Sequence, residues 1–116
     1  MFRYRLSPEA RADITDILDA SERLHGTDAR GRYLGLLVAA LRRVAATPMG
    51  RATAARDAIE PGLRSLHIRH CRTESREAQV HAPVHVLYYR VVDAENVQIV
   101  RVMHERMDFS RHMEGD

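Results

Sequence analysis

Two stretches with helical periodicity lie almost back to back near the start of the chain, and this constrains the fold more than any other feature of the sequence. Between Pro8 and Leu24, apolar residues recur at helical spacing while acidic residues occupy the other positions. Between Thr27 and Val44 the i, i+3, i+4 apolar pattern returns. The link of only a few residues around Gly26 leaves an antiparallel helical hairpin as the way to bury both apolar stripes.

The residue types at the helix ends support this hairpin. Ser7 can accept a hydrogen bond from a free amide of the first turn, and Pro8 fits the first helical position, where no donor is needed. Gly26 is typical of the residue that follows a helix. We expect Thr27 or Asp28 to cap the second helix with its side-chain oxygen.

The other regular elements are predicted to be strands. Residues 2–6 alternate apolar and basic side chains, which is the period of a strand with one buried face. Residues 63–70, 84–92 and 97–103 are alternating or rich in β-branched and aromatic residues. The polar residues 93–96 are predicted to form a hairpin turn between the last two strands.

Two segments are predicted to connect the regular elements. We expect residues 48–62 to link the hairpin to the strands, with a helical turn at residues 54–59, and residues 71–83 to form a polar hairpin loop. The order of elements is typical of an α+β fold, in which an N-terminal strand is followed by an α-helical hairpin packed on a mainly antiparallel β-sheet. A length of 116 residues predicts a single domain, residues 1–116.

The sequence carries no signal of a membrane or secreted protein. No segment approaches the apolar length that crosses a bilayer, and the first six residues lack the apolar run of a signal peptide. Cys71 has no second cysteine with which to form an intrachain disulfide. We therefore predict a cytoplasmic protein without membrane contact.

The positive charge is concentrated in the middle of the chain. All 18 basic residues are arginine, and residues 29–73 hold nine of them against two acidic residues, a net charge of +7. Guanidinium groups match carboxylate and phosphate geometry, so an arginine-rich centre favours an anionic partner, either nucleic acid or an acidic protein surface. An equally good interpretation of the same composition is that these arginines are solvated surface residues.

Several cysteine and histidine side chains raise the question of a metal site, but their spacing argues against one. His67 and His70 are three residues apart, so in a strand they point to opposite faces. Cys71 stands in no acyl-transfer motif, and the chain has no glycine-rich phosphate loop and no serine elbow. We predict no metal site, no cofactor and no catalytic residue.

Imidazole and guanidinium groups gather where the last predicted strand ends. Such a group could act on a phosphodiester, with histidine as acid or base and arginine stabilising charge, or it could form a recognition surface. We favour recognition, because no nucleophile with an adjacent base accompanies these side chains. The predicted target-binding residues are Arg64, Arg69, His104, Arg106, Arg111 and His112.

Four segments carry a resemblance to a known family. They are LSPEA at residues 6–10, PGLRSL at 61–66, VLYYRV at 86–91 and IVRVMHERMD at 99–108. These segments resemble ParE toxins of the RelE/ParE superfamily of type II toxin-antitoxin systems, and the likeness extends over nearly the whole chain. The last segment is the most specific of the four.

The resemblance implies a function that the residues alone do not give. It implies a toxin that inhibits DNA gyrase by protein contact, is neutralised by a ParD-like antitoxin, and meets DNA only indirectly through the antitoxin complex. The RelE branch of the superfamily instead cleaves mRNA on the ribosome, so an endoribonuclease is the alternative. This chain has no lysine, and residues 107–109 offer Met, Asp and Phe where a tyrosine is expected for that activity.

Overall fold

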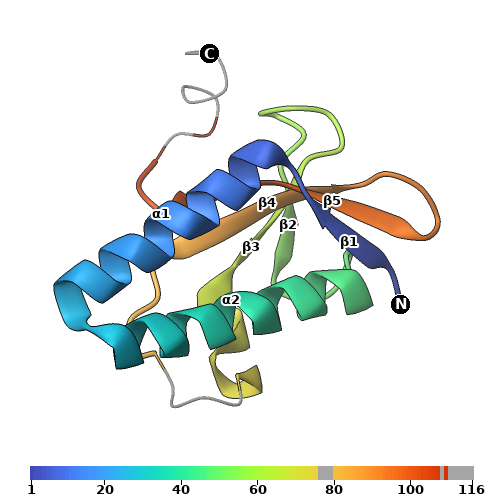
Figure 1. Cartoon of the computed structure of the whole chain (residues 1–116). Helices are drawn as coiled ribbons and strands as arrows, with labels where there is room; N and C mark the ends of the chain where they lie inside the picture. Colours follow the sequence, from blue (N-terminus) through green and yellow to red (C-terminus); the bar gives the residue numbers. More distant parts are fainter. Residues whose placement is uncertain (76–79, 108, 110–116) are drawn as a thin grey trace.

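The helical hairpin predicted from the sequence is present in the computed structural model, which describes residues 1–75, 80–107 and 109. Helix α1 (Pro8–His25) begins after Ser7, whose hydroxyl oxygen accepts a hydrogen bond from the Ala10 amide at 2.9 Å, as expected. Helix α2 (Thr27–Ala46) follows after one residue. Both helices lie on the same face of the β-sheet (Figure 1).

The cap predicted for α2 is wrong. Gly26, with a φ of 95°, serves both as the last cap of α1 and as the first cap of α2, so Thr27 and Asp28 already lie inside the helix. A positive φ lets glycine reverse the chain within one residue, which leaves no room for a separate capping side chain. The link is therefore shorter than the sequence pattern indicated.

The sheet has five strands in the order β1-β5-β4-β3-β2. Strand β1 runs parallel to β5, and the other neighbours are antiparallel, so the sheet is mainly antiparallel as predicted. A register shift between Tyr88 and Tyr89 marks a β-bulge in the β4–β5 pair. The bounds of the strands are β1 (Arg3–Leu6), β2 (Thr53–Ala55), β3 (Arg64–His67), β4 (His85–Val91) and β5 (Asn96–His104).

Two predictions about the central part of the chain are wrong. The helical turn expected at residues 54–59 starts later, because Thr53–Ala55 pairs with β3 and forms the short edge strand β2. A turn forms only at residues 56–60, where the Arg56 carbonyl accepts hydrogen bonds from the Ile59 and Glu60 amides. The strand expected at residues 63–70 ends at His67, and the 3-10 helix η1 (Ile68–Glu74) follows in place of strand and loop. Ring nitrogen Nδ1 of His67 accepts a hydrogen bond from the Arg69 amide, which starts this helix.

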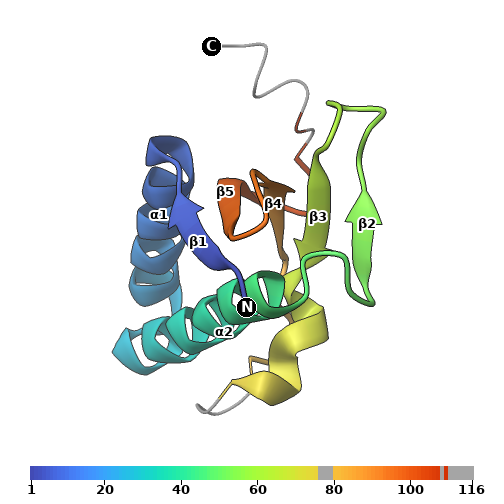
Figure 2. The same cartoon turned by 90° about the vertical axis from the view of Figure 1, so that its right-hand side faces the viewer.

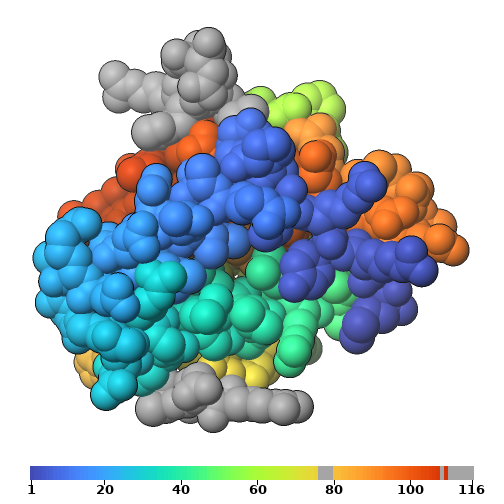
Figure 3. All heavy atoms as spheres, in the orientation of Figure 1, coloured from blue at the N-terminus to red at the C-terminus, as the bar shows by residue number. Residues whose placement is uncertain are grey.

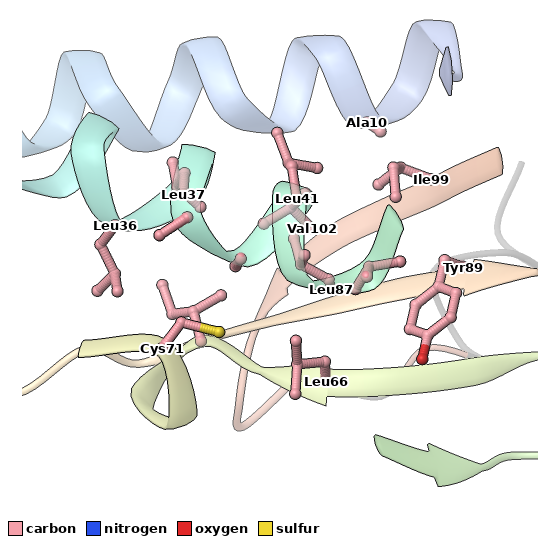
Figure 4. Packing of buried hydrophobic residues seen from close by; sticks show 14 of the residues in the cluster. Ala10, Leu36, Leu37, Leu41, Leu66, Cys71, Leu87, Tyr89, Ile99 and Val102 are labelled. Carbon is pink, nitrogen blue, oxygen red and sulfur yellow. The ribbon is translucent and has the colours of Figure 1, made fainter. Parts of the chain in front are cut away.

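The main core lies between the helical hairpin and the sheet (Figure 4). Leu36, Leu37 and Leu41 of α2 and Leu18 of α1 are buried there, and Ile14 is half-buried against them. All five belong to the apolar residues at helical spacing from which the two helices were predicted. Leu66, Leu87, Ile99 and other strand residues supply the opposing surface.

The face of the sheet that is turned away from the helices carries a smaller apolar cluster. Leu63, Met103 and Phe109 are buried in it, and Tyr88 and Val100 pack against them. The rings of Tyr88 and Phe109 lie 4.7 Å apart between centroids. Figure 2 shows the helices on one side of the sheet only, so this second cluster depends on residues of the strands and on Phe109.

A buried ion pair fixes α1 against β5. Both carboxylate oxygens of Asp13 accept hydrogen bonds from the Arg101 guanidinium, at 2.8 and 2.9 Å, and one of them also accepts from the Val102 amide. The two side chains are only 15% and 16% exposed. None of the helices in the described part of the chain is long and apolar enough to cross a membrane.

Candidate functional site

Three histidines and two further polar residues meet at one end of the sheet, and we name them the histidine cluster. They lie where β3 ends, β4 begins and β5 ends. His85 of β4 is paired with His104 of β5, and their rings contact edge to face with centroids 5.8 Å apart. The members of the histidine cluster are Tyr33, His67, His85, His104 and Glu105.

Tyr33 of α2 connects this cluster to the helical hairpin. Its hydroxyl accepts a hydrogen bond from the Val84 amide at 3.2 Å and lies 2.5 Å from Nδ1 of His85. Since the amide can only donate, the hydroxyl hydrogen is available for the imidazole nitrogen. Burial, together with the neighbouring His104 and His67, lowers the pKa of His85 to about 4. Burial also raises the pKa of Tyr33, so both side chains are neutral at physiological pH.

His67 and Glu105 form the exposed side of the cluster. Nε2 of His67 lies 3.0 Å from Oε2 of Glu105, and the Glu105 amide donates to the Val84 carbonyl. The hydrogen bond from His67 lowers the pKa of the Glu105 carboxyl, and the positive charge of Arg69 acts in the same direction. Glu105 is therefore a carboxylate in this site.

All three imidazoles use the same ring nitrogen as an acceptor. Nδ1 of His67 accepts from the Arg69 amide, and Nδ1 of His104 accepts from the Arg106 amide, both at 3.1 Å. Nδ1 of His85 faces the Tyr33 hydroxyl. A ring nitrogen that accepts a hydrogen bond carries no hydrogen, so a ring that accepts at Nδ1 can donate only through Nε2.

The structure brings together only part of the predicted target-binding set. His104 is in the histidine cluster, and Arg69 and Arg106 are exposed beside it. Arg64 lies elsewhere: its guanidinium donates to the Pro48 carbonyl and to the Thr53 hydroxyl, so it holds the connection between α2 and β2. Arg111 and His112 lie outside the described residues.

Sequence reasoning missed the cluster members that come from distant segments. Tyr33 falls within the helical periodicity of residues 27–44, and neither His85 nor Glu105 is among the predicted target-binding residues. The register of the β4–β5 hairpin was a usable signal, because strands that flank a turn at residues 93–96 place His85 close to His104. No local pattern indicates that Tyr33 reaches His85, 52 residues along the chain.

Within the described residues, no group of three or more His, Cys, Asp or Glu side chains is arranged to hold a metal ion. Cys71 is buried in the core, and burial raises the pKa of its thiol to about 11. A thiol in that state is a poor nucleophile at neutral pH. The chemistry that the site offers is therefore hydrogen bonding and charge, from Arg69, Arg106, Glu105 and the imidazole rings.

A shallow groove of about 550 Å³ lies along the outer side of α2. Small apolar residues form much of its floor, and Arg42 and Arg43 border it. Arg43 is already paired with Glu74 at 3.1 Å, whereas Arg42 is exposed. The groove and the histidine cluster thus lie on different sides of α2, since Tyr33 points toward the sheet.

Comparison with known proteins decides the family. The family model described as "ParE toxin of type II toxin-antitoxin system, parDE" matches residues 4–109 of this chain. The chain belongs to the ParE toxin family. This confirms the resemblance seen in the sequence, and it makes the chain the toxin component of a toxin-antitoxin system.

Individual relatives of this ParE-family toxin agree in length and in fold. It is 38% identical to Toxin ParE1 of Mycobacterium tuberculosis over 112 residues, covering 96% of this chain and 97% of the relative. It is 32% identical to Toxin ParE1 of Caulobacter vibrioides, covering 95% and 96% of the two chains. A solved structure of the chromosomal ParDE system from P. aeruginosa has a TM-score of 0.64 at 20% identity, with 90% and 96% coverage. That last likeness confirms the α+β fold.

Proposed function

We propose that this toxin inhibits DNA gyrase by direct protein contact and that a ParD-like antitoxin neutralises it. The whole chain, residues 1–116, acts as one domain in the cytoplasm, and it meets DNA only through the antitoxin complex. The observation that carries the proposal is the family match over residues 4–109, which leaves little of the chain unmatched. Gyrase is the target implied by the ParE branch of the superfamily.

The geometry of the histidine cluster favours contact over cleavage. A general base needs a free nitrogen near its substrate, but Nδ1 of each imidazole already accepts a hydrogen bond. Nε2 of His67 faces Glu105, and His85, with a pKa of about 4, is a weak base. The exposed cations Arg69 and Arg106 are suited to bind carboxylates of a protein partner.

The target is tested with purified proteins in two parallel assays. Purified toxin is added to a gyrase supercoiling reaction and to a ribosome-dependent translation reaction. We expect loss of supercoiling and unchanged translation. Cleavage of ribosome-bound mRNA that is abolished by His104→Ala, with gyrase unaffected, would replace this proposal with the endoribonuclease alternative.

The contact residue with the clearest prediction is Arg106. Arg106→Lys keeps the charge but removes the bidentate geometry of guanidinium, so we expect gyrase inhibition to weaken about tenfold, as for one charge-assisted hydrogen bond. The fold and antitoxin binding should not change. Arg23→Lys at an exposed position of α1 is the matched control, and equal effects of the two substitutions would remove Arg106 from the target surface.

To neutralise the toxin, the antitoxin needs a surface whose charge is opposite to that of the toxin. Residues 29–73 of the toxin carry a net charge of +7, and β1 and β2 are the edge strands of its sheet. We propose that an antitoxin segment with acidic and apolar residues covers the helical hairpin and an edge of the sheet. Copurification of the toxin with a ribbon-helix-helix protein encoded next to it is the test.

A further inference from the structure

The face of the sheet that is turned away from α1 and α2 differs in chemistry from the covered face, and we call it the open face. The two helices spread over the covered face in the space-filling view (Figure 3), and both stay on that side when the molecule is turned (Figure 2). Leu63 and Met103 belong to the small cluster on the open face. Side chains alternate along a strand, and paired residues of neighbouring strands point to the same side, so the strand registers determine which other residues share this face.

Arg90 of β4 lies on the open face. Arg64 of β3 pairs with Tyr89 of β4, so the residues next to them, Leu63 and Arg90, lie level with each other. Since Leu63 points to the open face, Arg90 does so as well. The Arg90 guanidinium forms an ion pair of 2.7 Å with Glu60.

Two further arginines lie level with Arg90, one on each side of it. Gln98 of β5 pairs both with Arg90 of β4 and with Arg5 of β1. On the other side, the Arg56 amide donates to the Leu63 carbonyl and extends the β2–β3 pairing by one residue. We name Arg5, Arg56 and Arg90 the arginine row. Its neighbouring members are two strands apart, which separates their backbones by about 10 Å.

The two outer guanidinium groups of the arginine row are available to a partner. Arg5 and Arg56 are exposed, and neither forms an ion pair with a described residue. Asp93 of the neighbouring turn interacts electrostatically with Arg5 but forms no ion pair with it. Nε of Arg56 donates to the Ser65 hydroxyl oxygen at 2.9 Å, which holds this side chain over the sheet. A side chain that is already held loses less conformational freedom when it binds.

An aromatic patch lies beside the arginine row. Tyr88 is two residues from Arg90 on β4 and therefore shares its face. Its half-buried ring lies 4.7 Å from the ring of Phe109, between centroids, and Val100 packs in the same cluster. Within the described part of the chain, the Tyr88 hydroxyl forms no hydrogen bond. Tyrosine and arginine are among the side chains that most often carry the binding energy of a protein interface.

The charges on the open face fit a protein segment better than a nucleic acid or a second copy of the toxin. Glu60 pairs with Arg90, and Glu105 pairs with His67, which shares the open face through its pairing with Val86. These two carboxylates would repel a continuous chain of phosphates. A second copy would bring further unpaired guanidinium groups into the interface. Separate carboxylates on either side of an apolar side chain match both the arginine row and the aromatic patch.

We infer that the open face is the surface through which the toxin contacts gyrase. The contacted segment of gyrase presents carboxylates to Arg5 and Arg56, and an apolar or aromatic side chain that packs on Tyr88. The inference rests on the proposed function and specifies which surface of the toxin performs it. It places the contact on strands β1, β4 and β5 and on the residue that follows β2, away from the outer side of the helical hairpin.

Hydroxyl-radical footprinting of the wild-type toxin, with and without excess purified gyrase, is the first test. Oxidation of Tyr88 should fall about fivefold or more when gyrase is added, because the centre of an interface excludes water. Leu24 and Leu34 are 68% and 44% exposed on the helical hairpin, and their oxidation should not change. Protection of these leucines with Tyr88 unchanged would overturn the inference and leave the proposed function intact.

Charge reversal within the arginine row is an independent test. The double variant Arg5→Glu, Arg56→Glu should weaken inhibition of supercoiling about tenfold or more, with a stronger effect at low salt. The double variant Arg11→Glu, Arg23→Glu changes the net charge equally at exposed positions of α1, and it should weaken inhibition by about threefold at most. Thermal unfolding and antitoxin binding of the first variant verify that it is folded. Equal inhibition by the two double variants would overturn the inference.

The aromatic patch is tested at Tyr88. Tyr88→Ala should weaken inhibition of supercoiling about tenfold, whereas Tyr88→Phe keeps the ring and should change it by about threefold at most. A loss of inhibition in Tyr88→Ala counts only if the variant still binds antitoxin, and the charge-reversal variants decide the question if it does not. Full inhibition by a folded Tyr88→Ala protein would overturn the inference.

The other occupants of the open face give different results. Protection of Tyr88 by a DNA or RNA oligonucleotide without gyrase would assign the face to nucleic acid and overturn the inference. Protection that increases with toxin concentration alone would assign it to a second copy, with the same consequence. Failure of the wild-type toxin to inhibit gyrase would instead contradict the proposed function.

Discussion

At the scale of single residues, protonation of His85 makes the stability of the folded chain depend on pH. The imidazole is half-buried between Tyr33 and His104, and burial is the main reason that its pKa is lowered from 6.5 to about 4. The unfolded chain therefore binds a proton at a higher pH than the folded chain does. The contribution of His85 to stability is complete above pH 6.5 and is lost as the pH falls through about 4.

We predict that the free energy of unfolding decreases as the pH falls from 6.5 to 4, with His85 contributing at most about 3 kcal/mol of this change. Burial also lowers the pKa of His70, which acts in the same direction. Urea unfolding at several pH values measures the effect. His85→Gln should flatten the pH dependence, whereas His81→Gln at an exposed position should leave it unchanged.

The presence of an arginine in the sequence is a weak guide to its function. Arg64, Arg69 and Arg106 look alike in the sequence, yet Arg64 donates to Pro48 and Thr53 within the fold while the other two are exposed. The role of each guanidinium depends on which acceptors the tertiary structure brings to it. Target binding stays a prediction for all six residues, which are Arg64, Arg69, His104, Arg106, Arg111 and His112.

At the scale of elements, α2 is held by the burial of one stripe. Leu37 is 1% exposed, whereas Leu34 on the same helix is 44% exposed. We predict that Leu37→Ala lowers the free energy of unfolding by about 2–5 kcal/mol, because it removes buried methyl groups and leaves a cavity. Leu34→Ala is the control and should change stability by less than about 0.5 kcal/mol. Thermal and urea denaturation measure both, and a fully stable Leu37→Ala protein would contradict the packing of α2.

Helix α1 is held against β5 by a polar contact as well as by apolar packing. Asp13→Asn removes the carboxylate charge that pairs with Arg101, and we predict a loss of about 3 kcal/mol, because the charge of a largely buried guanidinium is no longer balanced by this carboxylate. Asp19→Asn disrupts the exposed pair with Arg30, in which the side chains are 60% and 34% exposed, and should cost about 1 kcal/mol or less. Similar losses for the two variants in urea unfolding would show that the Asp13 contact is not a buried pair.

At the scale of the whole molecule, an antitoxin that binds only the folded toxin must stabilise it. At an antitoxin concentration about a thousand times the Kd, linkage predicts a gain of about 4 kcal/mol in apparent stability. We therefore expect the complex to melt at a higher temperature than the free toxin, by an amount that rises with antitoxin concentration. Calorimetry of the toxin with and without antitoxin measures this, and identical melting temperatures would exclude a tight complex.

The elements whose signals are local could be predicted from the sequence alone. The helices, the Ser7 cap, the hairpin and the strands β1, β3, β4 and β5 follow from periodicity and end residues, because these depend on hydrogen bonds and side chains a few positions apart. The core leucines of α2 follow for the same reason, since helical spacing alone determines which side chains share a face.

Other features depend on contacts between separate segments and become visible only in the folded chain. Strand β2 forms because residues 53–55 pair with β3, although the local composition favours a helical turn. The histidine cluster exists because α2 brings Tyr33 to His85, and β4–β5 pairing brings His85 to His104. The edge position of β1 likewise depends on its pairing with the distant strand β5. The contact of Tyr33 with His85 joins residues 52 positions apart and leaves no trace in local periodicity, which is why it could not be derived from the sequence.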